Sequence, residues 1–356
     1  MRITVLPDWR SENPYQQLLA DALNALSVEC TFPEGYRRVL PISRSVLPKP
    51  RPDLLHLHWP SAYLRDPRPK LRAIYCERTL IDLTLVRKAS IPVVWTVHNL
   101  VSHDTSVPML EKRFSRRLAH LADALVVHSM SAQATVISEL GVEPCKTCVI
   151  PHGSLSDAYG PAPERSVART ALGLPTEVPV ALFFGMIRPY KGVVNLLRAW
   201  DALVEHRCEA ILFIAGKALD EKYGTEVAEL AAQIPSVRLD LRFVPDSEVP
   251  LLMAAADLFV VPFSQSLTSG TVRLAQDYDL PVVAPRLPGT ADEPGIMYVD
   301  GSGIDALGET ILEALNRYRD RPRVKAKINT WNEIASKHAS LYQRMLRSVN
   351  RPLPQS

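Results

Sequence analysis

The sequence predicts an α/β protein built from two doubly wound parallel sheets. Short apolar runs rich in β-branched residues alternate with amphipathic helical stretches along the whole chain, which is typical of right-handed βαβ units. The chain has 356 residues, more than the roughly 150 of a usual domain. The alternation restarts near residue 178, after a loose stretch at 154–163 that contains Gly160, Pro161 and Pro163. Two domains joined near this stretch account for the length.

The expected strands of the first half share a short apolar core that ends at a proline or a polar residue. They are Ile3–Leu6, Leu54–His58, Pro92–Val97, Ala124–His128 and Thr147–Pro151. Between them, apolar residues recur at helical spacing, and Asn13 and Pro14 form a typical helix start. The expected helices are Pro14–Leu26, Lys70–Lys88, Pro108–Leu121 and Ser131–Leu140.

The second half repeats this pattern. Its expected strands are Val180–Gly185, Ala210–Ala215, Val237–Phe243, Leu258–Val261 and Val282–Ala284. Its expected helices are Gly192–Glu205, Lys222–Ala232, Glu248–Ala255, Thr271–Tyr278 and Gly303–Tyr318. We expect an N-terminal domain at 1–165, a second domain at 166–330, a helix at 331–347 that packs back on the first domain, and a tail at 348–356.

Composition narrows the class of protein. A formal charge of +3, with 47% hydrophobic and 22% charged residues, is ordinary for a globular chain and does not indicate nucleic-acid binding. No apolar run approaches the roughly 18 residues that cross a bilayer, and the first strand is too short for a signal peptide. Five cysteines do not suggest a disulfide framework. We therefore expect a cytoplasmic protein.

The loop after Val180–Phe184 carries the strongest functional signal. Gly185 and Gly192 frame Arg188 and Lys191 at the crossing from a strand to a helix. Two cations beside a helix N-terminus suit an anion such as a diphosphate; the alternative is a solvated loop. A second such loop contains Thr268, Ser269 and Gly270, whose hydroxyls and amides fit either an anion cradle or a plain helix cap.

Histidines mark the ends of strands in the first half. His98 and Asn99 follow one strand, and His103 lies in the same loop. His56 and His58 end another strand, where a period of two places them on one face. Trp59 follows them, as either a stacking platform for a sugar or a core residue.

Other signals are discounted. Cys145 and Cys148 form a CxxC pair without a second pair, so we expect no metal there. Asp277 and Asp279 are expected at a solvated helix end. Neither GxGxxG nor GxxxxGK[ST] occurs, which argues against nicotinamide or P-loop nucleotide binding.

Together these loops resemble the GT-B glycosyltransferases, specifically family-4-like enzymes of bacterial polysaccharide and glycolipid assembly. The resemblance covers nearly the whole chain and rests on the segments 184–192, 256–263, 280–284, 96–99 and 149–153. It implies a nucleotide-sugar donor in the C-terminal domain, an acceptor site in the N-terminal domain and an active site in the cleft between the two domains. It also implies no required metal or cofactor.

The resemblance also assigns roles to residues. Arg188 and Lys191 would hold the donor diphosphate and stabilise it as the leaving group, and His98 would lie beside the donor sugar. The donor-binding residues it implies are Gly185, Gly216, Phe243, Val244, Ser266, Thr268, Ser269, Gly270 and Thr271. Those on the acceptor side are Asn13, Trp59, Asn99, His103 and His152.

One departure from the family pattern concerns its paired glutamates. Counting back from Pro281, their positions are occupied here by Ser266 and Leu274. The donor sugar, the base and the stereochemical outcome therefore stay open, as does the oligomeric state.

Clustered cations in the first half suggest contact with an anionic membrane and a lipid-linked acceptor, or simply a solvated face. They are Arg37, Arg38, Arg51, Arg65, Arg68, Lys70 and Arg72, with Lys112, Arg113, Arg116 and Arg117 on one helix. Peripheral attachment to the inner face of the plasma membrane would follow.

The sequence thus predicts a glycosyltransferase that moves a hexose from GDP-mannose or a UDP-hexose to a saccharide or lipid-linked acceptor. The alternatives are a nucleotide-sugar epimerase of similar fold, which would need acid and base carboxylates, and a non-catalytic sugar-binding protein.

Overall fold

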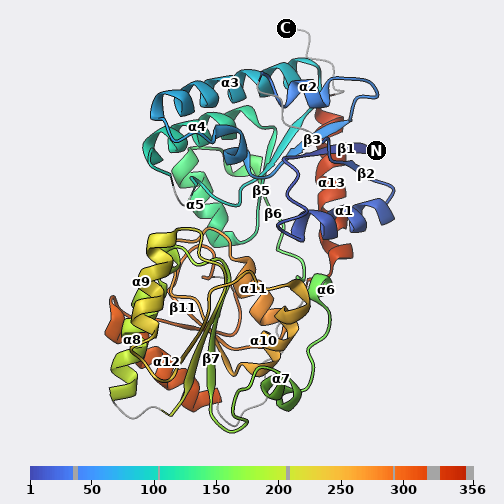
Figure 1. Ribbon diagram of the computed structural model, residues 1–356. Coiled ribbons are helices and arrows are strands. Elements are labelled where there is room, and N and C mark those ends of the chain that lie inside the picture. Colours follow the sequence, from blue (N-terminus) through green and yellow to red (C-terminus); the bar gives the residue numbers. More distant parts are fainter. Residues whose placement is uncertain (35–38, 103–104, 206–208, 292, 319–328, 350–356) are drawn as a thin grey trace. The chain divides into compact units, whose positions relative to one another are not determined.

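A computed structural model describes residues 1–34, 39–102, 105–205, 209–291, 293–318 and 329–349. The chain divides into two compact units (Figure 1). Unit 1 comprises Met1–Gly153 together with Asn329–Ser356, and unit 2 comprises Ser154–Ile328. The residues just after Gly153, which the sequence analysis placed in the first domain, thus lie in unit 2.

Over its described residues, unit 1 holds a six-stranded parallel sheet in the order β2-β1-β3-β4-β5-β6. Its strands are β1 (Arg2–Leu6), β2 (Glu29–Thr31), β3 (Leu54–Leu57), β4 (Val93–Thr96), β5 (Ala124–Val127) and β6 (Thr147–Val149). Its helices are α1 (Tyr15–Ala25), α2 (Ser43–Val46), η1 (Pro60–Leu64), α3 (Pro69–Lys88), α4 (Pro108–Leu121), α5 (Met130–Leu140), η2 (Pro144–Lys146) and α13 (Trp331–Val349).

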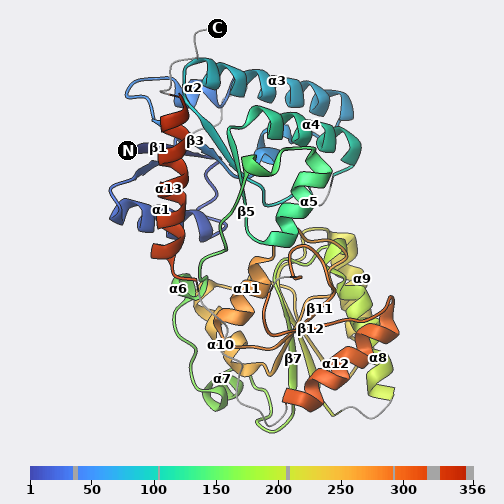
Figure 2. The ribbon, with the colours of Figure 1, turned by 180° about the vertical axis from the view of Figure 1, so that it is seen from behind.

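Helices cover both faces of this sheet. On one face, α1 packs against α13, and a core of side chains from Ile3, Leu19, Val126, Ile334 and Tyr342 lies beneath them. The opposite face carries α2 to α5, of which α3 and α4 lie side by side (Figures 1 and 2). The C-terminal helix therefore belongs to the core of unit 1, although the whole of unit 2 precedes it in the chain.

Over its described residues, unit 2 also holds a six-stranded parallel sheet, in the different order β12-β11-β10-β7-β8-β9. Its strands are β7 (Val180–Phe184), β8 (Ile211–Ala215), β9 (Val237–Asp240), β10 (Leu258–Val260), β11 (Val282–Ala284) and β12 (Ile296–Tyr298). Its helices are α6 (Ser156–Tyr159), α7 (Arg165–Ala171), η3 (Pro189–Lys191), α8 (Val193–Glu205), α9 (Glu221–Ala231), η4 (Asp246–Glu248), α10 (Val249–Ala255), α11 (Gly270–Asp277) and α12 (Ile304–Tyr318).

In unit 2, α8 packs against both α9 and α12, and α7 packs against α10 (Figure 2). A buried guanidinium joins the second pair to the sheet. Arg169 of α7 donates to the carbonyl of Ala255 at 3.0 Å and to the Asp257 carboxylate at 2.5 Å. Asp257 in turn accepts from the amide of Val180 at the start of β7.

The predicted fold class is confirmed, and each expected strand and helix is present, most with ends that differ by one or two residues. The prediction missed β2 and β12, which are edge strands of three residues each. It also missed short helices, including α6 in the stretch that was interpreted as loose. The expected strand that begins at Val237 ends at Asp240, so Phe243 lies in the following loop.

The expectation of a solvated helix end at Asp277 was wrong. Its side chain is fully buried and forms an ion pair with Arg273 at 2.7 Å. The same carboxylate accepts a hydrogen bond from the amide of Leu155 at 2.6 Å. A short loop before α6 packs over the end of α11, and this contact, which links distant parts of the sequence, removes Asp277 from water. Cys145 and Cys148 are both free thiols.

Among the described residues, no helix is long and apolar enough to span a bilayer.

Candidate active site

The strand order of each sheet indicates where the ligand-binding crevice of that unit lies. In open α/β sheets, ligands bind at the carboxyl ends of the strands, where neighbouring connections leave in opposite directions. In unit 2 this point lies between β7 and β10, because β8 and β9 follow on one side and β11 and β12 on the other. In unit 1 it lies between β1 and β3.

The two loops at the crevice of unit 2 contact each other directly. The amide and the hydroxyl of Ser264 both donate to the carbonyl of Tyr190, at 2.9 and 3.1 Å. Gly192 has a φ of +71°, and a Cβ there would collide with the carbonyl oxygen of Pro262. Glycine is therefore required both by the left-handed turn and by the approach of the second loop.

Lys191 is buried between these loops, with 8% of its surface exposed. Its ammonium group lies 4.9 Å from the centre of the Phe263 ring. Burial, and then the charge of Arg188, lower the pKa of Lys191 to about 8. No carboxylate forms an ion pair with Lys191 among the residues that the structure describes. A buried cation beside a second cation is costly unless an anion binds, so this pair is suited to an anionic ligand.

The N-terminus of α11 lies beside this lysine. A Cβ on Gly185 would lie 3.2 Å from the Lys191 ammonium and 3.3 Å from the Thr271 methyl group. Ser269 is the N-cap of α11, and its hydroxyl accepts from the amide of Val272 at 3.3 Å. Ser269 therefore caps the helix, as the plainer interpretation expected. Amides at this helix start still add partial positive charge next to Lys191.

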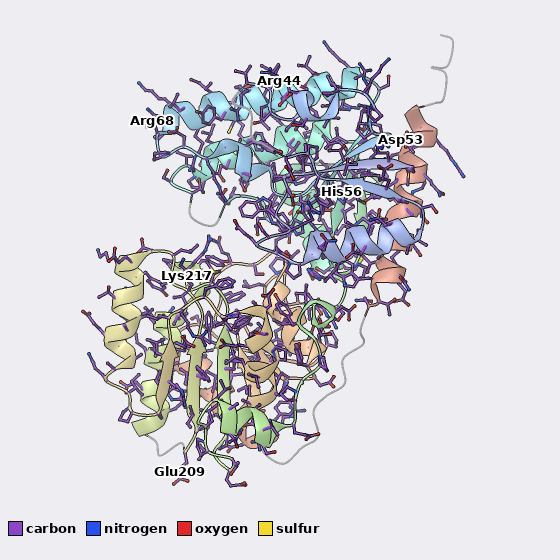
Figure 3. All side chains as sticks on the ribbon, turned by 45° about the vertical axis from the view of Figure 1, so that its right-hand side comes forward. Arg44, Asp53, His56, Arg68, Glu209 and Lys217 are labelled. Carbon is purple, nitrogen blue, oxygen red and sulfur yellow. The ribbon has the colours of Figure 1, made fainter. Side chains whose placement is uncertain are left out.

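Two further loops, which the sequence analysis assigned to donor binding, lie at the same carboxyl edge of the sheet in unit 2. They follow β8 and β9. A Cβ on Gly216, which follows β8, would collide with the carbonyl oxygen of Gly185, so these loops touch. Figure 3 shows Lys217 and Glu209 at opposite ends of unit 2. After β9, Phe243 is 66% exposed, whereas Val244 is buried.

The remaining predicted donor residues follow β10. The hydroxyl of Ser266 donates to the carbonyl of Thr268 at 3.0 Å, and a Cβ on Gly289 would collide with that hydroxyl. Ser266, Thr268, Gly270 and Thr271 are half-buried. Leu274, at the second glutamate position of the family pattern, is a buried core residue.

Unit 1 presents a different chemistry at the same end of its sheet. Buried histidines follow or end β3, β4 and β5, and half-buried His152 follows β6. His56 and His58 share a face, as predicted, with ring centres 4.2 Å apart. His58 Nδ1 lies 3.1 Å from His98 Nε2, so one of the two nitrogens donates to the other. His56 bonds to the Thr96 hydroxyl at 2.7 Å and to the Tyr342 hydroxyl at 2.8 Å.

Burial keeps His56, His58, His98 and His128 of this group neutral at pH 7. Burial is the main cause that places the pKa of His98 and His58 well below the ordinary value of histidine. Burial likewise lowers the pKa of His128 to about 3 and that of His338 to about 4. Tyr15 lies at the centre of the group, with its ring edge-on to His58, His98, His128 and His152 at 4.8–5.7 Å.

The predicted acceptor residues fall in different surroundings. Trp59 is half-buried and stacks on His98, with ring centres 4.2 Å apart and an interplanar angle of 14°. Asn99 lines a small cavity that Trp59 also lines. The Asn13 carboxamide accepts from the amide of Tyr15 at the start of α1. His152 packs against Tyr15 and Trp331. His103 lies outside the described residues, as do Arg37 and Arg38.

Sequence reasoning missed several members of the histidine group. His128 ended an expected strand, just as His58 did, and that position was a usable signal. His338 and Tyr342 carried no such signal, because only the packing of α13 against α1 places them beside β3.

Many of the predicted basic residues are engaged within unit 1. Arg68 pairs with Asp66 and Arg72 with Glu111, while Lys112 pairs with Glu139 and Arg117 with Glu77. Arg116 donates to the carbonyl of Glu139 and Arg51 to that of Leu47. Arg65 lies over the ring of Trp9. Lys70 and Arg113 are exposed.

Solved structures share this two-unit architecture over the whole chain. A sucrose-phosphate synthase from Thermosynechococcus elongatus superposes with a TM-score of 0.73 at 15% identity, covering 98% of this chain and 99% of that one. HepE from Anabaena, in complex with UDP-glucose, superposes with a TM-score of 0.66 at 17% identity, covering 98% and 97%. The fold is that of the GT-B glycosyltransferases.

Sequence comparisons identify the family. Residues 25–154 match Glycosyltransferase Family 4, and residues 178–317 match Glycosyl transferases group 1. A GDP-mannose:glycolipid 4-beta-D-mannosyltransferase from Xanthomonas campestris pv. campestris is 29% identical over 352 residues, which cover 96% of this chain and 92% of the relative. The chain belongs to the family-4-like glycosyltransferases, and it is a hexosyltransferase that uses a nucleotide-sugar donor.

Proposed function

We propose that the enzyme transfers mannose from GDP-mannose to a saccharide carried on a lipid. The observation that carries the donor assignment is the buried Lys191 beside Arg188 at the crevice of unit 2. The choice of mannose and of a glycolipid acceptor is supported by the Xanthomonas relative, whose similarity spans both units.

In this proposal unit 2 holds the donor. Arg188 and Lys191 bind the diphosphate, together with the amides at Gly270 and Thr271. As the bond to the sugar breaks, negative charge grows on the diphosphate, and these fixed positive groups stabilise it. Gly216 permits close approach near the ribose, and Phe243 and Val244 lie against the base. Ser266, Thr268 and Ser269 contribute hydroxyls around the sugar.

Unit 1 holds the acceptor in this proposal. His98 lies beside the reacting sugar, where a neutral imidazole can both donate and accept a hydrogen bond. Trp59 restricts the ring of His98 by stacking, and His58 fixes its Nε2. Asn99, His152 and Asn13 line the acceptor side, with His103 in the adjacent loop.

We further propose that transfer inverts the anomeric carbon. Leu274 and Ser266 replace the paired glutamates of the family pattern, so the donor sugar is not held by carboxylates at these positions. The Xanthomonas relative is described as forming a β-mannosyl linkage, and GDP-mannose carries an α-linked sugar.

A donor panel tests the function. Purified enzyme is incubated with GDP-mannose, UDP-glucose and UDP-galactose, with and without a membrane lipid extract from a polysaccharide-producing bacterium. We expect acceptor-dependent release of GDP and a β-anomeric product signal by NMR. Release from a UDP-sugar would overturn the donor, an α-linked product would overturn inversion, and an isomerised donor would favour the epimerase alternative.

We also propose that α3 attaches the enzyme to an anionic membrane. Ile74, Ile81 and Leu85 are 58%, 56% and 36% exposed, and their spacing places them on one face of the helix. Lys70 and Lys88, which are also exposed, share this face. An apolar stripe flanked by cations suits the interface of a bilayer with anionic headgroups. Arg113 of the neighbouring α4 adds a further exposed cation.

Vesicle binding tests this surface. Replacing Ile74 and Ile81 by serine should weaken binding to vesicles that contain phosphatidylglycerol by about tenfold, since each isoleucine loses most of its apolar surface. The matched control is Val167→Ser, because Val167 in unit 2 is equally exposed at 57%. Equal binding of the wild type and the double variant would contradict the proposal.

A further inference from the structure

A cavity at the crevice of unit 1, between β1 and β3, contributes no residue to the site described above. It is a cavity of about 470 Å³, whose polar lining comes from Asp8, Arg10, Ser11, Glu34, Ser45 and Tyr63. None of these residues contributes to the donor site or to the histidine group. We propose that this cavity holds a neutral pyranose unit of the acceptor saccharide, recognised by Asp8 and Arg10. The inference deepens the proposed function and rests on it.

The position of the cavity follows from the topology. It lies where the chain leaves β1, at 6–11, and it is closed by residues that follow β2 and β3. The switch point of the sheet is between β1 and β3, the place where ligands of such sheets bind. The histidine group lies further along the same edge, after β3 to β6.

Its chemistry suits vicinal hydroxyl groups. Arg10 Nε and the second guanidinium nitrogen each donate to Asp8 at 2.9 Å. The guanidinium stacks 3.9 Å from the centre of the Phe32 ring, which holds one face of the pair. The hydrogen bond from Arg10 holds the pKa of Asp8 below its usual range. A rigid carboxylate beside a rigid guanidinium can accept from one sugar hydroxyl and donate to the next.

The charge of the lining favours a neutral ligand. Asp8 and Glu34 are acidic, and Arg10 is the cation that faces them. The hydroxyl of Ser45 donates to the carbonyl of Pro41 at 2.7 Å, so it offers the ligand an acceptor. An excess of carboxylate disfavours a phosphate or a uronate.

Aromatic contacts connect the cavity to His98. Trp9, which lies between Asp8 and Arg10 in the sequence, meets Trp59 edge-on at 6.4 Å. Trp59 stacks on His98. Neither indole is part of the cavity lining, so the two rings link the loop that holds Asp8 and Arg10 to His98 through side-chain contacts alone.

The chain contains a matched control for the Asp8–Arg10 pair. Asp66 and Arg68 form the same motif with the same bonds: Arg68 Nε and its terminal nitrogen donate to Asp66 at 3.0 and 3.1 Å. This pair does not line the cavity. Figure 3 shows Arg68 at the periphery of unit 1, whereas His56 lies in its interior.

The experiment compares Asp8→Asn and Arg10→Gln with Asp66→Asn and Arg68→Gln. The probes are methyl α-D-mannopyranoside, methyl β-D-glucopyranoside and methyl β-D-glucuronide, titrated by saturation-transfer NMR without donor. We expect the wild type to bind at least one neutral pyranoside more tightly than the glucuronide. Asp8→Asn and Arg10→Gln should weaken that binding and raise the acceptor KM at least about tenfold, with kcat and GDP binding unchanged. The control pair should stay within about twofold.

Separate outcomes distinguish the two claims. The first outcome is that Asp8→Asn abolishes pyranoside binding but the wild type transfers no sugar from any donor. This outcome would overturn the proposed function and leave the cavity assignment intact. Transfer with an acceptor KM that is unchanged in Asp8→Asn, or changed equally in Asp66→Asn, would overturn the cavity assignment, as would tighter binding of the glucuronide. Glu34→Gln is a further cavity variant. Because the Glu34 side chain is exposed, this substitution should leave folding intact, and pyranoside binding that is weakened in it would support the cavity assignment.

Discussion

Both units are doubly wound parallel sheets of six strands, and they differ in the chemistry at the carboxyl ends of their strands. In unit 2 the loops after β7 and β10 carry Arg188, Lys191 and the N-terminus of α11. In unit 1 the corresponding edge carries neutral histidines grouped around Tyr15. Fixed positive charge suits a diphosphate leaving group, and neutral imidazoles suit hydroxyl groups and proton movement.

This difference teaches that the sheet order sets where a ligand binds, while loop residues set which ligand it is. The first strand of each unit, β1 or β7, borders the switch point of its sheet, although it is the second strand from the edge in unit 1 and the third in unit 2. Neither sheet order contains information about charge. The following variants address each unit separately.

The largest effect is expected at Lys191. Lys191→Ala removes a buried positive group from the diphosphate site, so we expect kcat to fall by about 10²–10³ and GDP to bind more weakly. Arg188→Ala should act in the same direction. Steady-state kinetics and calorimetric titration with GDP measure both quantities. Lys217→Ala is the control, since this exposed lysine follows β8 in the same unit; undiminished GDP binding in both site variants would refute the diphosphate assignment.

A smaller and more selective effect is expected at His98. His98→Ala should lower kcat by about 10² and leave GDP binding unchanged, because the diphosphate site belongs to unit 2. His120→Ala is the control, since His120 is exposed on α4. If His98→Ala weakened GDP binding as much as Lys191→Ala does, the claim that unit 2 alone binds the diphosphate would be contradicted.

Mild acid should affect unit 1 before unit 2. The folded-state pKa values of His128 and His338, about 3 and about 4, lie below the 6.5 of an unfolded histidine. Below pH 6.5 the unfolded chain therefore binds more protons, and stability falls by about 1.4 kcal/mol per pH unit for each such histidine. The described part of unit 2 contains no histidine, and burial raises the pKa of its Asp277, so protonation of that group favours folding.

Hydrogen exchange measured between pH 7 and pH 4.5 checks this prediction unit by unit. Peptides of β3, β5 and α13 should lose protection at a higher pH than peptides of β7 and β10. His338→Gln should reduce the slope for unit 1. Equal acid sensitivity of the two units would show that the buried histidines do not govern the stability of unit 1.

Much of the fold was predictable because apolar periodicity is a local property. The central strands were found within one or two residues, since strands buried on both faces read as continuous apolar runs. The edge strands β2 and β12 were missed because three residues that pair on one side only leave little pattern. The expectation that Asp277 is solvated was wrong because its burial depends on a contact with Leu155, which is distant in the sequence.

The candidate site divides in the same way. Gly185, Arg188, Lys191 and Gly192 were found because a left-handed turn and a pair of cations leave their mark within eight residues of sequence. His338 and Tyr342 were not found, because α13 reaches the histidine group only after unit 2 has been completed. The Asp8–Arg10 pair was missed because an acid and a base two residues apart resemble any solvated loop.

The sequence by itself determined the class of fold, the order of its strands and helices, and the cations of the donor loop, because spacing and charge can be read along a chain. Only the tertiary structure decided that histidines from separate strands and from the C-terminal helix share one buried group. It also decided that Lys191 is held out of water. Burial and the pKa shifts that it causes depend on which distant segments pack together, and that information is absent from any local stretch of the sequence.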